Sequence, residues 1–150
     1  VYKRQLSDLA LIALPARPSP SALVAILEAA AHHRLHAAMV LVGVHRVPAP
    51  VVLDLTWPRI HPKAREIRVP GLTVHLDGPT VQLLHWHACR QRLDRRRAGP
   101  AWRQSLRVFV DEVGRPYTEA NADEAVTIAT AKAGLPPLTF AELRDLMSPP

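Results

Sequence analysis

The sequence has little of two residue classes, and each shortage excludes something. Cys89 is the only cysteine in 150 residues, so neither an intramolecular disulfide nor a cysteine-built zinc site can form. A reducing cytoplasm is the expected location. Aromatic residues make up only 5% of the chain, so the core is expected to be aliphatic, with Trp57, Trp86 and Trp102 as isolated large anchors.

Long apolar runs are also missing. No stretch approaches the roughly 18 consecutive apolar residues that a bilayer-spanning helix needs, so no membrane association is expected. The first residues, Val1 to Gln5, contain neither an initiator methionine nor the order of regions found in a signal peptide. We therefore expect this chain to be a fragment, or to begin within a longer gene.

What the chain does have is apolar material for one core and an excess of arginine. Hydrophobic residues account for 48% of the sequence, which suits a single domain. The 19 Lys and Arg residues outnumber the 13 Asp and Glu residues. Because the guanidinium group binds phosphate through a planar fork of donors, this excess favours a polyanionic partner. A compositional bias of the coding sequence fits the same excess equally well.

Apolar spacing predicts three helices in the first third of the chain. Ser21 can cap a helix that runs to about His33, with one apolar stripe. The nearly continuous apolar segment Leu35 to Val44 predicts a buried helix, and a short helix is expected from about Pro50 to Leu55.

The middle of the chain predicts a hairpin followed by a long helix. Glu66 to Val69 and Thr73 to Leu76 are β-compatible runs, and the Pro70-Gly71 pair between them supplies turn chemistry. A helix is expected from Thr80 to about Arg97, with a proline tolerated in its first turn.

Capping signals organise the last third. Leu106 to Val110 alternates as a strand does, and Thr118 can cap a helix over residues 119 to 132 that Gly134 closes. Thr139 and Glu142 have the spacing of a capping box and predict a final helix. The fold class expected from these elements is mainly α with a small antiparallel β-sheet (α+β).

The last segment also carries a family resemblance. Residues 106 to 147 read LRVFVDEVGRPYTEANADEAVTIATAKAGLPPLTFAELRDLM. In order, this segment predicts a strand, a Gly-Arg-Pro turn, a helix that stops at Ala-Gly-Leu, and a second helix that starts with Leu-Thr-x-x-x-Leu-Arg. This order resembles the catalytic domain of tyrosine recombinases, the phage integrase family. Upstream, PSPSALVAILEAA is similar to the family's opening helix, LDLTWPRIHPKAREIRV to the stretch after its first arginine box, and VHLDGPTVQLLHWHACRQR to its post-hairpin helix. The resemblance covers about residues 18 to 148 and implies the recombinase catalytic fold without its C-terminal helices.

The resemblance assigns site residues only in part. Arg144 matches the family's second catalytic arginine, while the histidine that leads this motif falls on Ala141. Gapless matching of the first arginine box from Gly43 places His45 on the arginine, and Arg46 reaches that position after a slip of one residue. Arg46 is therefore the tentative first arginine, and we expect Arg144 to be vestigial as a catalytic group.

Other parts of the family's catalytic set have no match. The predicted hairpin loop contains no lysine, and Lys63, which precedes the strand, is a poor substitute. The family's third-box histidine and nucleophilic tyrosine follow the second arginine, where this sequence has only six further residues, among them no His or Tyr. Tyr117 aligns with a structural position. Because attack on a phosphodiester needs a nucleophile and two arginines on the phosphate, we expect the chain as given not to cleave and rejoin DNA.

A basic cluster at the end of the long predicted helix is a second candidate site. The DNA-binding residues expected from the whole sequence are Lys63, Arg68, Arg90, Arg95 and Arg96. A solvated helix end is the alternative, because cations at a helix C-terminus also oppose its dipole. His32 and His36 lack a third ligand of convincing spacing, so no metal site and no cofactor are expected.

Residues 1–17 are expected to be a linker or remnant, and residues 18–150 a partial recombinase-like catalytic domain. The expected role is that of a degenerate or truncated site-specific recombinase, whose family binds, integrates and recombines DNA. The alternative is a non-catalytic basic helical module for protein interaction. Self-association is expected if the missing helices leave an apolar surface exposed.

Overall fold

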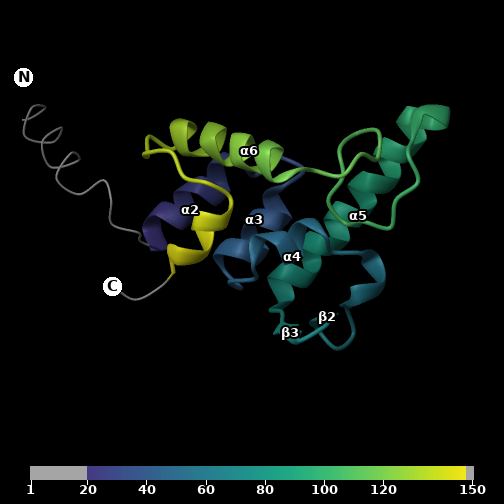
Figure 1. Ribbon diagram of the computed structural model, residues 1–150, viewed down its shortest axis with the longest axis horizontal. Helices are drawn as coiled ribbons and strands as arrows, with labels where there is room; N and C mark the ends of the chain where they lie inside the picture. The colour runs from purple at the N-terminus through teal and green to yellow at the C-terminus, as the bar shows by residue number, and fades with distance from the viewer. Residues whose placement is uncertain (1–19, 148–150) are drawn as a thin grey trace, which may run out of the picture.

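The computed structural model describes residues 20–147, so the expected linker, residues 1–17, lies outside it. The architecture is mainly α-helical with one small antiparallel sheet, which confirms the predicted fold class. Figure 1 shows the long helix α5 running from the sheet to one end of the molecule, with α2, α6 and the C-terminal segment gathered at the other. The elements are α2 (Pro20–Ala29), α3 (His36–Gly43), α4 (Ala49–Leu53), η1 (Trp57–Arg59), β1 (Ile60–His61), β2 (Glu66–Val69), β3 (Leu72–His75), α5 (Gly78–Ala98), η2 (Gly99–Ala101), α6 (Glu119–Lys132) and η3 (Ala141–Asp145).

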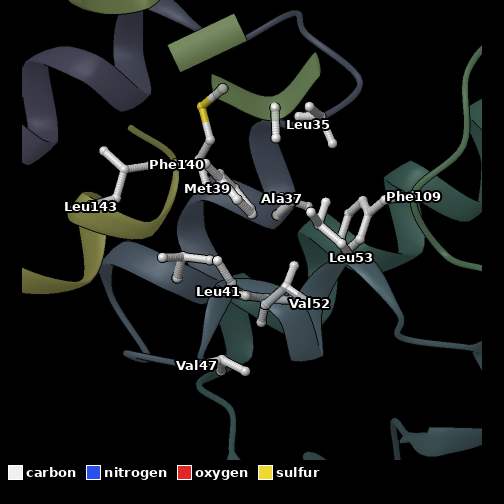
Figure 2. Close-up of a cluster of buried hydrophobic side chains, with 14 of the residues drawn as sticks. Leu35, Ala37, Met39, Leu41, Val47, Val52, Leu53, Phe109, Phe140 and Leu143 are labelled. Atoms are coloured by element: carbon white, nitrogen blue, oxygen red, sulfur yellow. The ribbon is translucent and has the colours of Figure 1, made fainter. Parts of the chain in front are cut away.

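Helix α3 forms the centre of the core. Every residue from Ala37 to Gly43 is buried, as the continuous apolar run predicts, because a helix without a polar face must be covered on all sides. Figure 2 shows α3 side chains enclosed by Val52 and Leu53 of α4, by Phe109, and by Phe140 and Leu143 near the C-terminus. The core therefore draws on segments distant in sequence.

Helices α2 and α6 pack on each other beside α3. Helix α2 ends at Ala29, earlier than the expected His33, and the residues up to Leu35 form turns. Gly43 permits a close approach of α2 to α3, since a Cβ at this position would lie 2.5 Å from Leu23 Cδ1. The packing of α2 on α3 thus depends on the lack of a side chain at Gly43 as well as on the apolar side chains around it.

The sheet has three strands in the order β1-β2-β3, all antiparallel. The predicted hairpin is confirmed as β2 and β3, with Val69 paired to Leu72 and Gly71 in a left-handed conformation (φ 77°). Strand β1 was not predicted from the sequence. Its two residues pair with Ile67 and Glu66, so the turn between β1 and β2 is a second hairpin turn.

Helix α5 begins as its sequence predicts. The Asp77 side chain accepts a hydrogen bond of 2.9 Å from the Thr80 amide and caps the helix, and Pro79 occupies the first turn. Hydrogen bonds with Thr80 lower the pKa of Asp77 from its ordinary value. Only Thr80, Leu84 and Asp94 of this helix are buried, so α5 is mostly a surface helix.

The strand predicted over Leu106 to Val110 is wrong. This segment forms only isolated bridges, Thr56 to Arg107 and Val110 to Pro116. On one side the pairing stops where η1 begins, because the Arg59 amide, the next donor of a ladder, bonds instead to the Thr56 carbonyl within the 3-10 turn at 3.0 Å. On the other side Asp111 accepts hydrogen bonds from two amides of the following turn and bends the chain away.

The last two elements follow their capping residues. Helix α6 spans the predicted residues, and Thr118 and Asn121 form a reciprocal capping box at its start. Thr139 and Glu142 form the predicted box as well, through hydrogen bonds of 2.9 and 3.2 Å. The predicted final helix is present at this second box, in the 3-10 form, as η3.

Candidate nucleic-acid interface

Arg144 lies on η3, which apolar anchors fix against the core. Phe140 and Leu143 are fully buried and Leu146 is nearly so, which leaves the arginine on the exposed side of the element. The Arg144 Nε donates a hydrogen bond of 2.8 Å to the carbonyl oxygen of Arg46, across 98 residues of sequence. The two residues that the family resemblance selected therefore lie next to each other.

Arg46 occupies a strained turn between α3 and α4. Its φ of 56° is in the left-handed region, which glycine adopts readily but L-residues other than asparagine and aspartate seldom do. Neighbouring amides close the turn onto α3, since Val47 donates to the Leu41 carbonyl at 3.0 Å. This conformation presents the Arg46 carbonyl oxygen to Arg144, while the Arg46 side chain is exposed and forms no ion pair with a described residue.

His45, the alternative match to the first arginine, faces a different partner. Its Nε2 lies 2.8 Å from the Thr80 Oγ1 and 3.7 Å from the Asp77 Oδ1, at the start of α5. The ring is largely enclosed, with 10% of the side chain exposed. His45 therefore joins α3 to α5, and of the two candidates only Arg46 is exposed and in contact, through its backbone, with Arg144.

The guanidinium of Arg144 is only partly engaged. Between residues 20 and 147 no partner is found for its two terminal nitrogens, and no carboxylate pairs with it. Ala141, at the place of the family histidine, is exposed and carries a methyl group that can neither donate nor accept a proton. The site can therefore bind an anion such as a phosphate but offers no acid or base from that position.

Tyr117, which the resemblance aligns with a structural position, packs beside His33. It lies just before the cap of α6, half-buried, with its ring 6.3 Å from that of His33. Burial raises the pKa of the Tyr117 hydroxyl, which lowers the fraction of phenolate at neutral pH. Tyr2, the other tyrosine of the chain, lies outside the described residues.

The cations expected on the sheet differ in availability. Lys63 is exposed in the turn between β1 and β2, so it lies in a hairpin turn that the sequence pattern did not reveal. Arg68 on β2 donates to the Glu66 Oε1 at 3.0 and 2.6 Å, which holds the pKa of that carboxyl below its ordinary value. Lys63 is free to meet a phosphate, whereas Arg68 already has a carboxylate partner.

The basic cluster on α5 also divides into two kinds of residue. Arg90 is half-buried and donates from Nη1 to the His32 carbonyl oxygen at 2.7 Å, so it connects α5 to the turn after α2. Arg95 and Arg96 are exposed on the last turn of the helix, where they oppose its dipole. In Figure 1 this end of α5 and η3 lie at opposite ends of the long axis. The predicted cations therefore form at least two separate groups.

One polar contact within the structure was missed by sequence reasoning. Arg34 donates from Nε and Nη2 to the two carboxylate oxygens of Asp94, at 2.9 and 3.0 Å. The Asp94 side chain is 8% exposed, and the hydrogen bond with Asp94 raises the pKa of Arg34. The two residues are 60 positions apart, so no local pattern could have paired them.

Two other kinds of feature are absent from the part of the chain that the structure describes. Between residues 20 and 147 no helix is both long and apolar enough to cross a bilayer. The same part of the chain contains no group of three or more His, Cys, Asp or Glu side chains placed to hold a metal ion.

The fold is similar to that of a solved recombinase structure. The crystal structure of XerA recombinase superimposes on 87% of this chain with a TM-score of 0.68 and 18% sequence identity. The chain has a recombinase-like fold. It spans about half of that recombinase, 48% of its length. No protein-family model and no curated protein sequence matches the chain.

Proposed function

We propose that this recombinase-like chain binds DNA and does not carry out strand cleavage and rejoining. The observation that supports this most is the placement of Arg144 beside Arg46 in a recombinase-like fold, with the terminal nitrogens of Arg144 free to contact a phosphate. The net charge of +6 favours the same partner. Arg144 and Arg46 then remain as phosphate-binding groups in a chain that no longer carries out the reaction.

The proposed loss of the reaction rests on what Arg46, Ala141, Arg144 and Tyr117 can supply chemically. Transfer of a phosphodiester to a protein hydroxyl requires a nucleophile, an acid for the leaving oxygen and charge stabilisation on the phosphate. Arg144 and Arg46 supply only the last of these. Ala141 cannot transfer a proton, and the Tyr117 hydroxyl is half-buried with a raised pKa.

Duplex DNA binding is the first test. Fluorescence anisotropy with a labelled duplex at several salt concentrations gives the affinity and the number of phosphates contacted. Replacing Arg144 by Ala should weaken binding about fivefold at low salt and reduce the salt slope by about one. The control is Arg115→Ala, which removes a charge already paired with Asp111 at 2.8 Å. Equal effects of the two substitutions would contradict a role for Arg144.

Covalent chemistry is tested separately. Incubation of the protein with a suicide DNA substrate, followed by denaturing electrophoresis, should give no protein–DNA adduct. An adduct that survives denaturation would contradict the proposal that the reaction is lost, while leaving DNA binding intact.

A protein-interaction module is the second candidate function. It is favoured by large apolar side chains on the surface, among them Trp86 at 62% and Leu106 at 67% exposure. Absence of duplex binding in the anisotropy measurement, at low salt, would favour this candidate over the first.

A further inference from the structure

A hollow at the far end of α5 combines cationic and aromatic side chains. It has a volume of 600 Å³ and lies on the opposite end of the molecule from η3. Its lining consists of Arg92, Arg95, Arg96, Gly99, Pro100, Trp102 and Gln104. This set joins three guanidinium groups, an indole and an amide, and neither the family resemblance nor the Arg144 site makes use of it.

The arginines of the hollow have no acidic partner. Arg95 and Arg96 are exposed and form no ion pair with any residue from 20 to 147, and Arg92 contacts only the Cys89 sulfur, at 3.2 Å. Other arginines of the chain are paired, Arg34 with Asp94 and Arg107 with Asp54. The charge lining the hollow is therefore available to an anionic ligand.

Trp102 is held in place before any ligand arrives. Its amide donates to the Gly99 carbonyl at 3.1 Å, and the next amide, of Arg103, donates to the Val113 carbonyl at 2.8 Å. Gly114, at φ 86°, lets the chain pass close to the indole, because a Cβ there would collide with the Arg103 carbonyl and lie 3.0 Å from Trp102 Cε2. A half-buried indole on a fixed backbone, with Gly114 close to its ring, loses less entropy than a fully exposed one when a planar group stacks on it.

We propose that this hollow binds single-stranded nucleic acid, with phosphates on Arg92, Arg95 and Arg96 and one unpaired base stacked on Trp102. The chemistry of the lining selects this ligand. Guanidinium groups bind phosphate oxygens, an indole stacks on any base, and the amide of Gln104 can bond a base edge. A duplex keeps its bases stacked inside the helix, so it can meet the arginines but not the indole.

The inference deepens the proposed DNA-binding function and rests on it for the class of ligand, but not on Arg144. The two sites lie on different elements at opposite ends of the molecule, so each can fail alone. Arg144 governs binding of duplex, and the hollow governs the preference for unpaired strands.

The test compares single-stranded and duplex oligonucleotides of the same length. Affinities of the full chain for a labelled 12-nucleotide oligothymidine and for a 12-base-pair duplex are measured by fluorescence anisotropy. Trp102→Leu should weaken single-strand binding about tenfold, in line with the loss of one stacked base, and leave duplex binding unchanged. Trp102→Phe, which keeps a stacking ring, should stay within about twofold of the parent protein.

The arginines are tested with a charge-matched control. Arg95→Gln with Arg96→Gln should weaken single-strand binding about tenfold and lower its salt slope by about two. Arg59→Gln with Lys132→Gln removes the same charge at exposed positions away from the hollow, and should have a smaller effect. Circular dichroism melting confirms that each variant is folded.

Three results would overturn the inference. The first is a folded Trp102→Leu variant with unchanged single-strand affinity, which would leave only a polyanion-binding patch. The second is an equal loss of duplex binding in that variant. The third is a parent protein that binds duplex but no single strands, which would exclude the hollow as a single-strand site while leaving the proposed function in place.

Discussion

Helices α3 and α5 are held in the structure by opposite kinds of interaction. Helix α3 is buried on every side by aliphatic and aromatic side chains, and few polar groups pack against it. Helix α5 buries few apolar residues and is attached through polar contacts: Arg34 to Asp94, Arg90 to the His32 carbonyl, Gln91 to Trp57, and His87 to the Val108 carbonyl. We therefore expect packing around α3 to contribute most to stability and α5 to display much of the positive charge, so that the two helices respond to different perturbations.

The largest expected effect comes from opening the core around α3. Phe140→Ala removes a fully buried ring that covers α3, and it should lower the free energy of unfolding by about 3–5 kcal/mol. Urea denaturation followed by circular dichroism measures this loss. Leu106→Ala, at a side chain 67% exposed, is the control and should change stability by less than about 0.5 kcal/mol. Similar losses in both variants would break the assignment of stability to the α3 region.

The next effect concerns the strongest polar attachment of α5. Asp94→Ala leaves the Arg34 guanidinium without its bidentate partner and should cost about 3 kcal/mol, at the low end for a buried pair because Arg34 is 26% exposed. The matched control is Asp54→Ala, which breaks the exposed pair with Arg107 and should cost less than about 1 kcal/mol.

The same pair allows a sharper test of how α5 is held. Replacing Arg34 by Met together with Asp94 by Leu should restore most of the lost stability, since an apolar pair can substitute for a buried ionic one. If the double variant is as unstable as Asp94→Ala, the contact contributes through more than its own charges. Urea midpoints of the three proteins decide between the two outcomes.

The smallest expected effect is the share of the pH dependence of stability that comes from His87 on α5. Burial lowers the pKa of His87 from its ordinary value of 6.5, so protons bind the unfolded chain more readily than the folded one. The stabilising contribution of neutral His87 is present above pH 6.5 and is lost as the pH falls below it. His87→Gln, which can still donate to the Val108 carbonyl, should show a smaller loss of stability between pH 7 and pH 5.

His75→Gln makes the same substitution at the surface, where the side chain is 81% exposed, and serves as the matched variant for comparison with His87→Gln. Burial also lowers the pKa values of His33 and His36, so part of the pH dependence should persist in the His87 variant. An unaltered pH profile in His87→Gln would show that His87 is not the group that titrates.

Local signals made the helices predictable. Thr118 and Gly134 set the ends of α6, and Asp77 with Pro79 set the start of α5, because caps and prolines act within a few residues. The apolar run of α3 was equally plain. The two-residue strand β1 could not be predicted, because two residues are too few to show an alternating pattern and form a strand only by pairing with β2.

Only those site residues that lie within a recognisable sequence motif could be predicted from the sequence. Arg144 came from its resemblance to a family pattern, and its contact with Arg46 required the fold, since 98 residues separate them. Trp102 carried no signal of a site, because its position beside Arg95 and Arg96 depends on the turn at Gly99 and on the backbone near Gly114. The internal use of Arg90 was likewise invisible in a run of similar arginines.

The burial of α3 has a consequence for the order of events during synthesis. Its apolar surface is covered in part by Phe140 and Leu143, so the ribosome must add about a hundred residues after α3 before the helix can be enclosed. Until then Met39 and Leu41 remain accessible to chaperones and to other nascent chains. This exposure ends when η3 packs against α3, and slow translation of the last third of the chain should prolong the exposure.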